Sequence, residues 1–566
     1  MSLSVPFYTN KQPADERKLR GGYYTPNELA HYLIKWGIRE DTKRILEPSC
    51  GDGNFIVETL EHIQKLVRNN NKIPEEITAV ELNPKELKKA KERSELIGKN
   101  GTRIDWIHQD FFKAYSSLAR EDKFDLVIGN PPFIRFQYFN DDSRALAFKH
   151  LEEAGYKTTK LANCWVAFVE LSIELIRNGG RLAMVVPAEL LQVNYANQLR
   201  QRLTSQFEQI IIIGFEKLVF PEIQQEIFLL LADGKHELSN TPSDIYTIEL
   251  YDGIQLQYLN NLSDFVAHIP AKHSRNGMKW TSLFIEESAY KALDEAQKCS
   301  RLLPLGSLAS VDVGIVTGRN SFFILNEFKR NQLQASSLSI PIVGRTSAFT
   351  TPVFNQIDFE NYKNIYPSYL LDLSGVFLPK FPLIMDYIKL GEKEGINLGY
   401  KCRIRKRWFD VPSIYTPNAF LFRQIHRYPL LVVNKAQATC SDTIHRVRVK
   451  NWVDITKLAC IFFNSLTLAW AEVCGRSYGG GVLELEPREA EELPIAYSDS
   501  IGIDIDKVVS LIKKGSVYEA LDYVDNVVLK DFLGFDHLIM REIRKAWEQL
   551  RDRRNERRHN LTYEKQ

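Results

Sequence analysis

Hydrophobic and polar positions follow two different periods along the first part of the chain. Helical spacing alternates with short apolar runs, which are typical of buried strands. The predicted helices cover residues 28–37, 54–68, 84–97 and 165–177, the last of them closed by Gly179-Gly180. The predicted strands cover residues 44–47, 77–81, 104–110, 124–129, 181–186, 209–215 and 225–232. Strands that alternate with helices in this way predict an α/β domain with an open, mostly parallel sheet.

Unusual residues follow four of these predicted strands. The first strand ends in Glu47-Pro48-Ser49-Cys50-Gly51-Asp52-Gly53, the second in Glu81, and the third in Asp110. The fourth runs into Asn130-Pro131-Pro132-Phe133. Because such sheets bind ligands at the carboxyl ends of their strands, we expect these residues to form one site.

The loop at residues 47–53 indicates which charged groups the ligand carries. It has neither a GxGxxG pattern nor a phosphate-binding lysine, which disfavours a dinucleotide or a nucleoside triphosphate. Glycines let the backbone approach a ligand, and Glu47 and Asp52 would attract a cation. S-adenosylmethionine has a positive sulfonium and no phosphate. In that reading Glu81 accepts from the ribose hydroxyls, and Asp110 from the adenine amine, with Phe111 against the ring.

The Asn130 segment suits a planar group that bears an amine. Two consecutive prolines lock φ and remove two backbone donors, so the turn is stiff and its carbonyls can face a ligand. An amide and an aromatic ring held there can bind such a group at its edge and on its face. By itself the pattern also suits an ordinary turn at the end of a strand.

Length and composition set the broad class. A chain of 566 residues should hold two or three domains, and 44% hydrophobic with 25% charged residues is typical of a globular protein. No apolar run is long enough for a membrane span, and no signal segment is recognisable. Seven cysteines without a CxxC pair suggest neither a disulfide framework nor a metal site, and favour a reducing, cytoplasmic location.

Taken together, residues 17–232 resemble the amino-group DNA methyltransferases of type II restriction-modification systems, in the gamma class that includes the TaqI enzyme. The segments that carry the resemblance are residues 20–26, 47–53, 81–84, 109–111, 130–133 and 219–221. They follow one another in the order of that class. Phe133 departs from the family, which often has tyrosine there, but stacking requires only the ring.

The resemblance implies a role for each matching residue. The implied contacts to S-adenosylmethionine come from Tyr24, Thr25, Glu47, Ser49, Cys50, Gly51, Gly53, Glu81, Leu82, Asp110, Phe111 and Asn130. The implied catalytic residues are Asn130, Pro131, Pro132, Phe133 and Phe220. Asparagine in this motif implies transfer to N6 of adenine, whereas serine is more often found in enzymes that modify cytosine N4.

In that family the target base is flipped out of the duplex, because its amine is inaccessible inside the stack. The Asn130 side-chain oxygen and the Pro131 carbonyl would accept from the amine and localise its lone pair, while Phe133 and Phe220 stack on the base. No metal is needed.

The resemblance also divides the chain into a catalytic domain, residues 1–270, and an α+β target-recognition domain, residues 271–566, with a helical tail. Candidate DNA contacts in the second domain are Lys401, Arg403, Arg405, Lys406, Arg407, Arg423 and Gln424. Arginine and lysine there would position double-stranded DNA, and glutamine would read an adenine edge. The last basic turns, to Arg558, either touch DNA or are solvated.

Other functions share some of these features. A methyltransferase of a protein glutamine or of an RNA base uses the same Asn-Pro-Pro-aromatic turn, but usually lacks a large C-terminal domain. A DNA-binding specificity subunit without catalysis would not need Asn130, Glu81 and Asp110. We find no nuclease motif and no spare domain before Arg20, so we expect a separate cognate endonuclease, and a monomeric enzyme.

Overall fold

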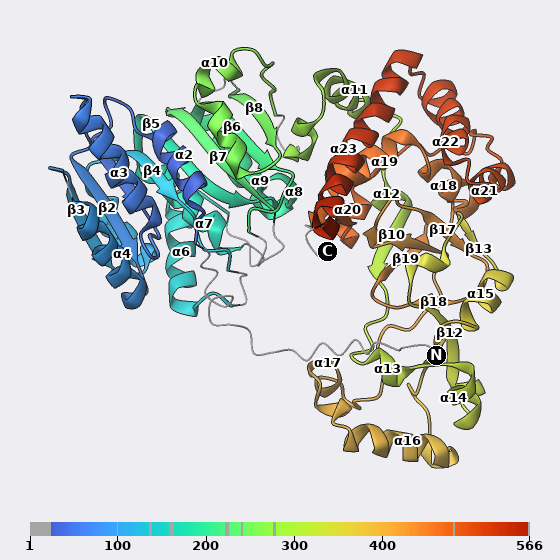
Figure 1. The fold of residues 1–566 in the computed structure, drawn as a ribbon. Helices are drawn as coiled ribbons and strands as arrows, with labels where there is room; N and C mark the ends of the chain where they lie inside the picture. The colour runs from blue at the N-terminus through green and yellow to red at the C-terminus, as the bar shows by residue number, and fades with distance from the viewer. Residues whose placement is uncertain are drawn as a thin grey trace. The chain divides into compact units, whose positions relative to one another are not determined.

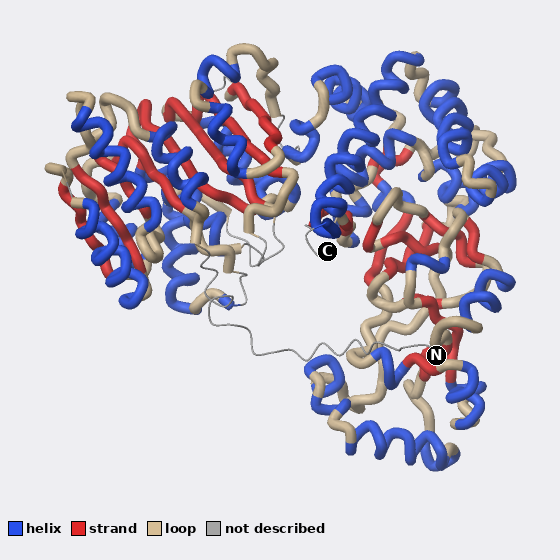
Figure 2. The backbone as a smooth tube through the Cα atoms, in the orientation of Figure 1, coloured by secondary structure: helices blue, strands red, loops and turns tan. Residues whose placement is uncertain are grey.

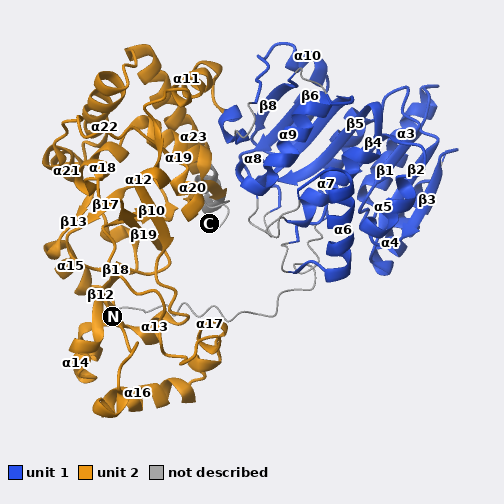
Figure 3. Cartoon of the chain, turned by 180° about the vertical axis from the view of Figure 1, so that it is seen from behind, with its two compact units in different colours: residues 1–284, 559–566 blue, residues 285–558 orange. Residues whose placement is uncertain are grey.

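The computed structural model describes residues 24–98, 100–134, 138–157, 163–220, 226–238, 242–274, 279–478 and 481–563. The chain forms two compact units, residues 1–284 with 559–566 and residues 285–558 (Figure 3). Our predicted boundary at residue 270 lies fourteen residues before the end of the first segment of unit 1, at Phe284.

An eight-stranded sheet forms the centre of the first unit (Figure 1). Its strands are β1 (Arg44–Glu47), β2 (Glu76–Glu81), β3 (Arg103–His108), β4 (Phe124–Gly129), β5 (Ile176–Pro187), β6 (Phe207–Phe215), β7 (Ile227–Lys235) and β8 (Asp244–Leu250). They lie in the order β3-β2-β1-β4-β5-β7-β6-β8. Strands β1 to β5 are parallel, and β7 runs antiparallel to both β5 and β6. The predicted mixed, mostly parallel α/β sheet is therefore confirmed.

Two groups of helices cover the sheet (Figures 1 and 2). One group is α2 (Asn27–Gly37), α3 (Asn54–Arg68) and α4 (Pro84–Ile97); the other is α5 (Phe111–Leu118), α6 (Asp141–Glu153), α7 (Cys164–Leu175) and α9 (Asn197–Gln206). The apolar positions of α3 recur at helical spacing, and Phe55, Leu60 and Ile63 are buried on the sheet side. Short helices follow β5 and β8: α8 (Glu189–Gln192) and α10 (Leu262–Val266).

Two local predictions in this unit are wrong. Gly179-Gly180 does not close a helix, because α7 ends at Leu175 and β5 begins at Ile176. The glycine pair lies inside β5, where the register with β4 shifts and Gly179 adopts a φ of +77°. Likewise, the third strand ends at His108, two residues earlier than predicted. Asp110 lies beyond the strand and caps α5, a helix that we did not predict.

The second unit contains several small sheets. Its strands are β9 (Leu303–Pro304), β10 (Ala309–Val313), β11 (Ile324–Leu325), β12 (Ser339–Val343), β13 (Val353–Phe354), β14 (Tyr369–Leu371), β15 (Ala419–Phe422), β16 (Gln424–Ile425), β17 (Leu431–Asn434), β18 (Thr439–Cys440), β19 (Ile444–Val449), β20 (Arg476–Tyr478), β21 (Val482–Glu484) and β22 (Pro494–Ile495). The largest sheet has the order β10-β19-β15-β17-β13. Strands and helices are intermixed, as expected for an α+β domain.

The helices of this unit surround the strands (Figure 2). They are α11 (Glu287–Gln297), α12 (Leu305–Leu308), α13 (Asn320–Phe323), α14 (Glu327–Gln332), α15 (Gln356–Lys363), α16 (Pro382–Lys393), α17 (Tyr400–Arg403), α18 (Ile455–Phe462), α19 (Ser465–Cys474), α20 (Pro487–Glu491), α21 (Ile505–Lys513), α22 (Val517–Asp525) and α23 (His537–Tyr563). The predicted helical tail is confirmed, with Val508, Leu521 and Val524 in its core. Among the described residues no single helix has the length and composition of a membrane span; α18 and α19 together do, but they meet at 77°.

Candidate active site and DNA-binding surface

The candidate active site lies where the strand order of the first sheet reverses. Strand β1 pairs with β2 on one side and with β4 on the other, so the loops that follow β1 and β4 leave neighbouring strand ends. A cofactor crevice opens at this position in sheets of this kind. The sequence motifs at Glu47, Glu81 and Asn130 therefore come together at the carboxyl ends of neighbouring strands.

Two glycines shape the loop after β1 in different ways. Gly53 precedes α3 with a φ of +84°, and a Cβ there would lie 2.6 Å from the Cβ of Ala90. It is therefore required for the close packing of α3 on α4. Gly51 has a φ of +54°, but a Cβ there would meet no atom within 4 Å. The backbone at Gly51 thus borders open space, as a ligand-binding loop requires.

Glu47 is buried at the base of this loop. Its side chain is 1% exposed, and its Oε2 has no hydrogen-bond partner within the described part of the chain. Burial, with the nearby charges of Glu81 and Asp52, raises the pKa of this carboxyl well above its usual value. Asp52 is already paired with Arg93, so Glu47 and Glu81 are the acids at the base of this loop that fit the positive end of S-adenosylmethionine.

Glu81 links the second strand to the same loop. Its Oε2 accepts from the Gly51 N–H at 2.8 Å, and its Oε1 accepts from the Asn83 N–H at 2.6 Å. Each carboxylate oxygen retains a second lone pair, so the group can also accept from vicinal hydroxyls. Beside it, the Leu82 side chain is 63% exposed and offers an apolar surface. This pair of residues fits a ribose and a planar ring.

The residues after β3 are placed differently from our prediction. Asp110 caps α5 by accepting from the Phe112 N–H at 2.8 Å, and its other oxygen accepts from the Ser143 hydroxyl at 2.7 Å. Phe111 is only 3% exposed, and Phe168 stacks on it at a centroid distance of 5.0 Å. Phe111 is therefore a core residue, and its ring is not presented to a ligand as we predicted.

The Asn130 side chain is held in one orientation. Its Nδ2 donates to Thr25 Oγ1 at 3.1 Å, and its backbone carbonyl accepts from the Ser49 hydroxyl at 3.3 Å. Thr25 is 7% exposed, and its carbonyl accepts from Asn54 Nδ2 at 2.8 Å. Arg93 in turn donates to Asn54 Oδ1 at 3.0 Å. We did not predict roles for Asn54 and Arg93. The sequence offered a signal only for Asn54, a polar residue directly after the glycine-containing loop.

The remaining predicted cofactor residues lie around this network. Cys50 donates its backbone N–H to the Val80 carbonyl at 2.9 Å, and burial raises the pKa of its thiol. The Tyr24 hydroxyl donates to Glu86 at 3.0 Å on the surface of α4, and the Tyr24 side chain is 48% exposed. Tyr24 is the first described residue, so residues 20–23 of the predicted motif at residues 20–26 lie outside the described residues.

Two aromatic residues differ in how much of their rings they present. Phe133 is partly buried and packs at the edge of the core of the first unit, whereas Phe220 is 6% exposed and belongs to that core. Pro131 is buried and Pro132 is partly exposed. Of the two predicted stacking residues, Phe133 is therefore the more accessible. Pro221 lies outside the described residues.

The basic cluster at residues 401–407 separates into two groups. Arg405 donates to the carbonyls of Val316 and Thr317 at 3.0 and 2.8 Å. Arg407 forms a bidentate pair with Asp410, at 2.8 and 2.9 Å. These two guanidinium groups are committed to the fold. The cluster's other cations are exposed and have no acidic partner within the described part of the chain: Lys401, Arg403 and Lys406.

The structure does not support our prediction that Arg423 contacts DNA. Its guanidinium lies 2.8 Å from Glu484 and 2.9 Å from Glu486, and it donates to the Asp442 carbonyl at 3.1 Å. Because its guanidinium lies between two carboxylates and a backbone carbonyl, this side chain stabilises the β16–β21 region, and its charge is compensated within the protein. The neighbouring Gln424 is exposed.

Two arginines of the C-terminal helix also hold the fold together. Arg554 is 2% exposed and pairs with the buried Glu472 at 2.7 Å. It also donates to the His426 carbonyl at 3.0 Å. Arg544 pairs with the buried Asp525. These side chains are not the solvated or DNA-binding charges that the sequence pattern indicated. No cluster of His, Cys, Asp and Glu that could hold a metal ion occurs among the described residues.

Two family models match this chain in succession. Residues 52–220 match the Eco57I restriction-modification methylase, and residues 277–529 match the C-terminal domain of the type II methyltransferase M.Eco57I. The type II methyltransferase M.AccI of Acinetobacter calcoaceticus is 24% identical over 506 residues, which cover 85% of this chain and 86% of that protein. M.XamI of Xanthomonas campestris pv. amaranthicola is 23% identical over 85% of this chain and 86% of its own length.

A solved structure of the type IIL restriction-modification enzyme MmeI in complex with DNA aligns with a TM-score of 0.57. The alignment covers 93% of this chain and 75% of that one at 13% identity, so it shows likeness of fold alone. The sheet, the strand-end acids and these matches define an S-adenosylmethionine-dependent methyltransferase. More particularly, the chain is a DNA methyltransferase of the type II restriction-modification kind.

Proposed function

We propose that this enzyme methylates N6 of an adenine that is flipped out of double-stranded DNA. The observation that carries the proposal is the orientation of Asn130 at the end of β4. Because Thr25 Oγ1 takes the amide nitrogen, the amide oxygen is the end that can accept from a substrate amine. The exocyclic amine of adenine is a planar donor of the kind that this turn suits.

The chemistry follows from the weakness of that amine as a nucleophile. Its lone pair is delocalised into the ring, so the amine attacks poorly while it remains planar. Acceptance by Asn130 Oδ1 and by the Pro131 carbonyl would draw the amine toward tetrahedral geometry, and the stiff Pro131-Pro132 turn would hold the acceptors in place. S-adenosylmethionine, when bound, supplies an activated methyl group.

The base must leave the helix to reach this site, which costs a few kcal/mol of unstacking. We propose that Phe133 stacks on the flipped adenine, and that Phe220 supports the wall of the pocket from the core. In the second unit, Lys401, Arg403 and Lys406 would contact phosphates, and Gln424 is the candidate for a base edge. Cleavage would belong to a separate endonuclease, and the enzyme would act as a monomer on DNA in the cytoplasm.

Modification mapping tests this proposal directly. Genomic DNA from a methylation-free host that expresses the chain should carry N6-methyladenine at one recurring sequence. N4-methylcytosine at such a sequence would overturn the choice of base. Unmodified DNA, from cells in which the folded protein binds S-adenosylmethionine, would overturn the proposed substrate.

The Asn130→Ala variant tests the site itself. It should lose methyl transfer by more than about 100-fold, because it removes an acceptor needed in the transition state. The affinity for S-adenosylmethionine should stay within a few-fold of the unmodified enzyme. Asn69→Ala is a matched control, since Asn69 is an exposed amide at the far end of α3. Full activity of Asn130→Ala would exclude the proposed role.

A further inference from the structure

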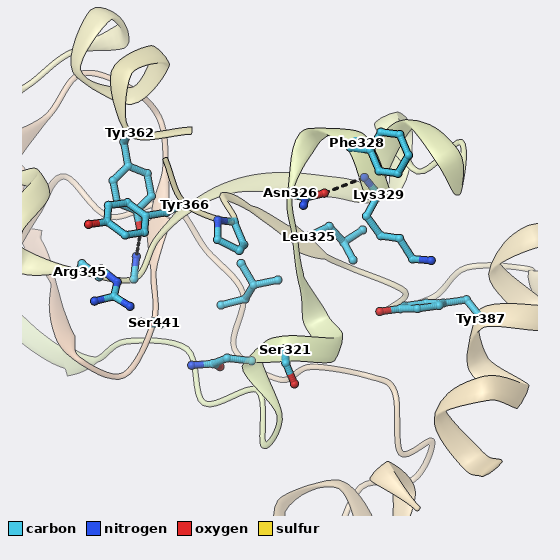
Figure 4. Close-up of a pocket in the computed structure, with 14 residues that line it drawn as sticks. Ser321, Leu325, Asn326, Phe328, Lys329, Arg345, Tyr362, Tyr366, Tyr387 and Ser441 are labelled. Carbon is cyan, nitrogen blue, oxygen red and sulfur yellow. Dashed lines mark hydrogen bonds between the residues drawn. The ribbon is translucent and has the colours of Figure 1, made fainter. Parts of the chain in front are cut away.

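A cavity lies in the second unit, apart from the residues discussed so far. It has a volume of about 620 Å³, a size that suits a small organic ligand. Helices α13 and α14 contribute to its wall, together with the segments around Arg345 and Tyr366 (Figure 4). No aspartate or glutamate lines it, although acids are common elsewhere in the chain. The lining therefore favours an anionic ligand.

Two cations lie at opposite ends of this cavity, each over an aromatic ring (Figure 4). The Arg345 guanidinium lies 4.9 Å from the ring centre of Tyr366, and the Lys329 Nζ lies 5.2 Å from that of Tyr387. Neither has an acidic partner within the described residues; Lys329 Nζ donates to the neutral Gln332 at 3.2 Å. Both charges are thus positioned by rings and remain available to an anion.

The aromatic walls are fixed by their own contacts. Tyr387 stacks on Phe322 with ring centres 4.4 Å apart, and its hydroxyl donates to the Phe322 carbonyl at 2.9 Å. On the other side, Tyr362 accepts from the Gly344 N–H at 2.9 Å. A cavity whose walls are already ordered loses little conformational entropy when a ligand binds.

Phe328 is the exception among these aromatic residues. It is 77% exposed, and no ring contact of this side chain occurs within the described part of the chain. Exposure of a phenylalanine costs free energy unless a partner covers it. Phe328 and Lys329 are consecutive residues of α14, and both side chains line the cavity. A ligand that combines a flat ring with a negative charge would use both.

The segment that carries the exposed basic cluster packs against residues 316–318, which lead into the cavity wall at Asn320. A Cβ at Gly318 would lie 3.0 Å from the Cβ of Lys401, so the two segments are in close contact. Arg405 holds the carbonyls of Val316 and Thr317, a few residues before the cavity residue Asn320. A nucleic-acid strand that follows Lys401 can therefore extend toward the cavity.

We propose that this cavity binds a nucleotide, with phosphate on Arg345 or Lys329 and the base against Phe328. The nucleotide is either part of the bound DNA or a free mononucleotide, and both sources present the same chemistry. The DNA source rests on the proposed function, since it requires that this unit bind DNA. Stacking on aromatic side chains and a basic groove are the usual means of binding nucleic-acid strands without pairing.

The test compares full-length variants for binding to labelled DNA and to AMP. The double variant Lys329→Ala/Arg345→Ala should bind labelled duplex at least about tenfold more weakly. The slope of log K against log salt should fall by about 0.9 if one of the two cations contacts a phosphate, and by about 1.8 if both do. Phe328→Ala should weaken binding at least about fivefold without changing that slope. The control, Lys513→Ala/Lys514→Ala, removes two exposed lysines of another region and should match the unmodified enzyme.

The outcomes separate the two sources. Loss of AMP binding with unchanged DNA binding would assign the site to a free nucleotide, whereas loss of DNA binding alone would assign it to the DNA. Unchanged affinities for both probes would overturn the proposal. Should a variant misfold, photocrosslinking of bromodeoxyuridine-substituted DNA or of 8-azido-AMP to the unmodified protein decides the matter: a crosslink at the Phe328 peptide is expected with one of the probes, and its absence with both would overturn the proposal.

None of these readouts requires methyl transfer. If the proposed function fails, modification mapping shows no N6-methyladenine, while the binding comparison still gives its answer. If the cavity proposal fails instead, the mapping is unaffected and the cavity variants bind both probes as the unmodified enzyme does.

Discussion

The side-chain nitrogen of Asn130 lies 3.1 Å from the hydroxyl oxygen of Thr25, although the two residues are 105 positions apart in the sequence. The contact joins the segment before α2 to the turn after β4. In this arrangement the amide nitrogen donates to the Thr25 hydroxyl, so the amide oxygen is the other end of the group. The orientation of the Asn130 amide therefore depends on a residue from a distant segment, which need not touch a substrate itself.

Removal of that hydroxyl should impair turnover more than binding. We expect Thr25→Val to reduce the single-turnover rate of methyl transfer by about tenfold or more, because the amide can then rotate away from its productive position. Thr25→Ser keeps the hydroxyl and should retain most of the rate. The two rates, measured with radiolabelled cofactor at saturating DNA, check this. Equal rates for both variants would contradict the positioning role.

Alanine substitutions of Gly51 and Gly53, in the loop after β1, should differ in their effect on stability. Gly53→Ala combines a left-handed backbone with a Cβ 2.6 Å from Ala90, so we expect it to destabilise the protein by about 3 kcal/mol or more. Gly51→Ala meets no neighbour and should cost only about 1 kcal/mol of backbone strain. Thermal unfolding of both variants measures this, and similar melting temperatures would show that the packing argument is wrong.

The sequence was sufficient to predict the framework of the site. Acids and glycines directly after apolar runs mark strand ends, and parallel strands bring those ends together whatever the details of the helices. Glu47, Glu81 and Asn130 could be placed in this way. Thr25, Ser49 and Cys50 came instead from the family resemblance, and the structure places them beside the same loops.

Residues whose partners are distant in sequence were harder to interpret. Arg423 looked like a DNA contact because it stands among polar residues, yet its partners Glu484 and Glu486 are some 60 positions away. Phe111 looked like a ligand contact because it follows Asp110, but Phe168 covers it. Local pattern does not reveal such long-range pairs, and therefore it overestimated how many side chains face a ligand.

Glu47 should make the stability of the cofactor-free protein depend on pH. Its folded-state pKa is raised above the usual 4.5, so its contribution to stability is present below that value and is lost as pH rises through the raised pKa. Glu47→Gln should remove this loss. We expect the variant to have a melting temperature about 2–4 °C higher than the unmodified protein at neutral pH, and a similar one in acid.

The same substitution should weaken the cofactor. A cation stabilises the ionised carboxylate, so binding of S-adenosylmethionine to the unmodified protein should release a proton, and the Gln variant should bind it more weakly without that release. Calorimetry in buffers of different ionisation enthalpy measures the proton. An unchanged affinity in Glu47→Gln would show that the buried carboxyl does not face the cofactor.

The basic cluster of the second unit should respond according to the partners of each side chain. Lys401, Arg403 and Lys406 are exposed and have no acidic partner among the described residues, so their joint replacement by alanine should lower the salt slope of DNA binding by up to about 2.7 while the melting temperature stays the same. Arg407→Ala should lower the melting temperature and leave the salt slope unchanged, because it breaks the bidentate pair with Asp410. Binding measured against salt, beside thermal unfolding, distinguishes them; an unchanged slope in the triple variant would place the DNA elsewhere.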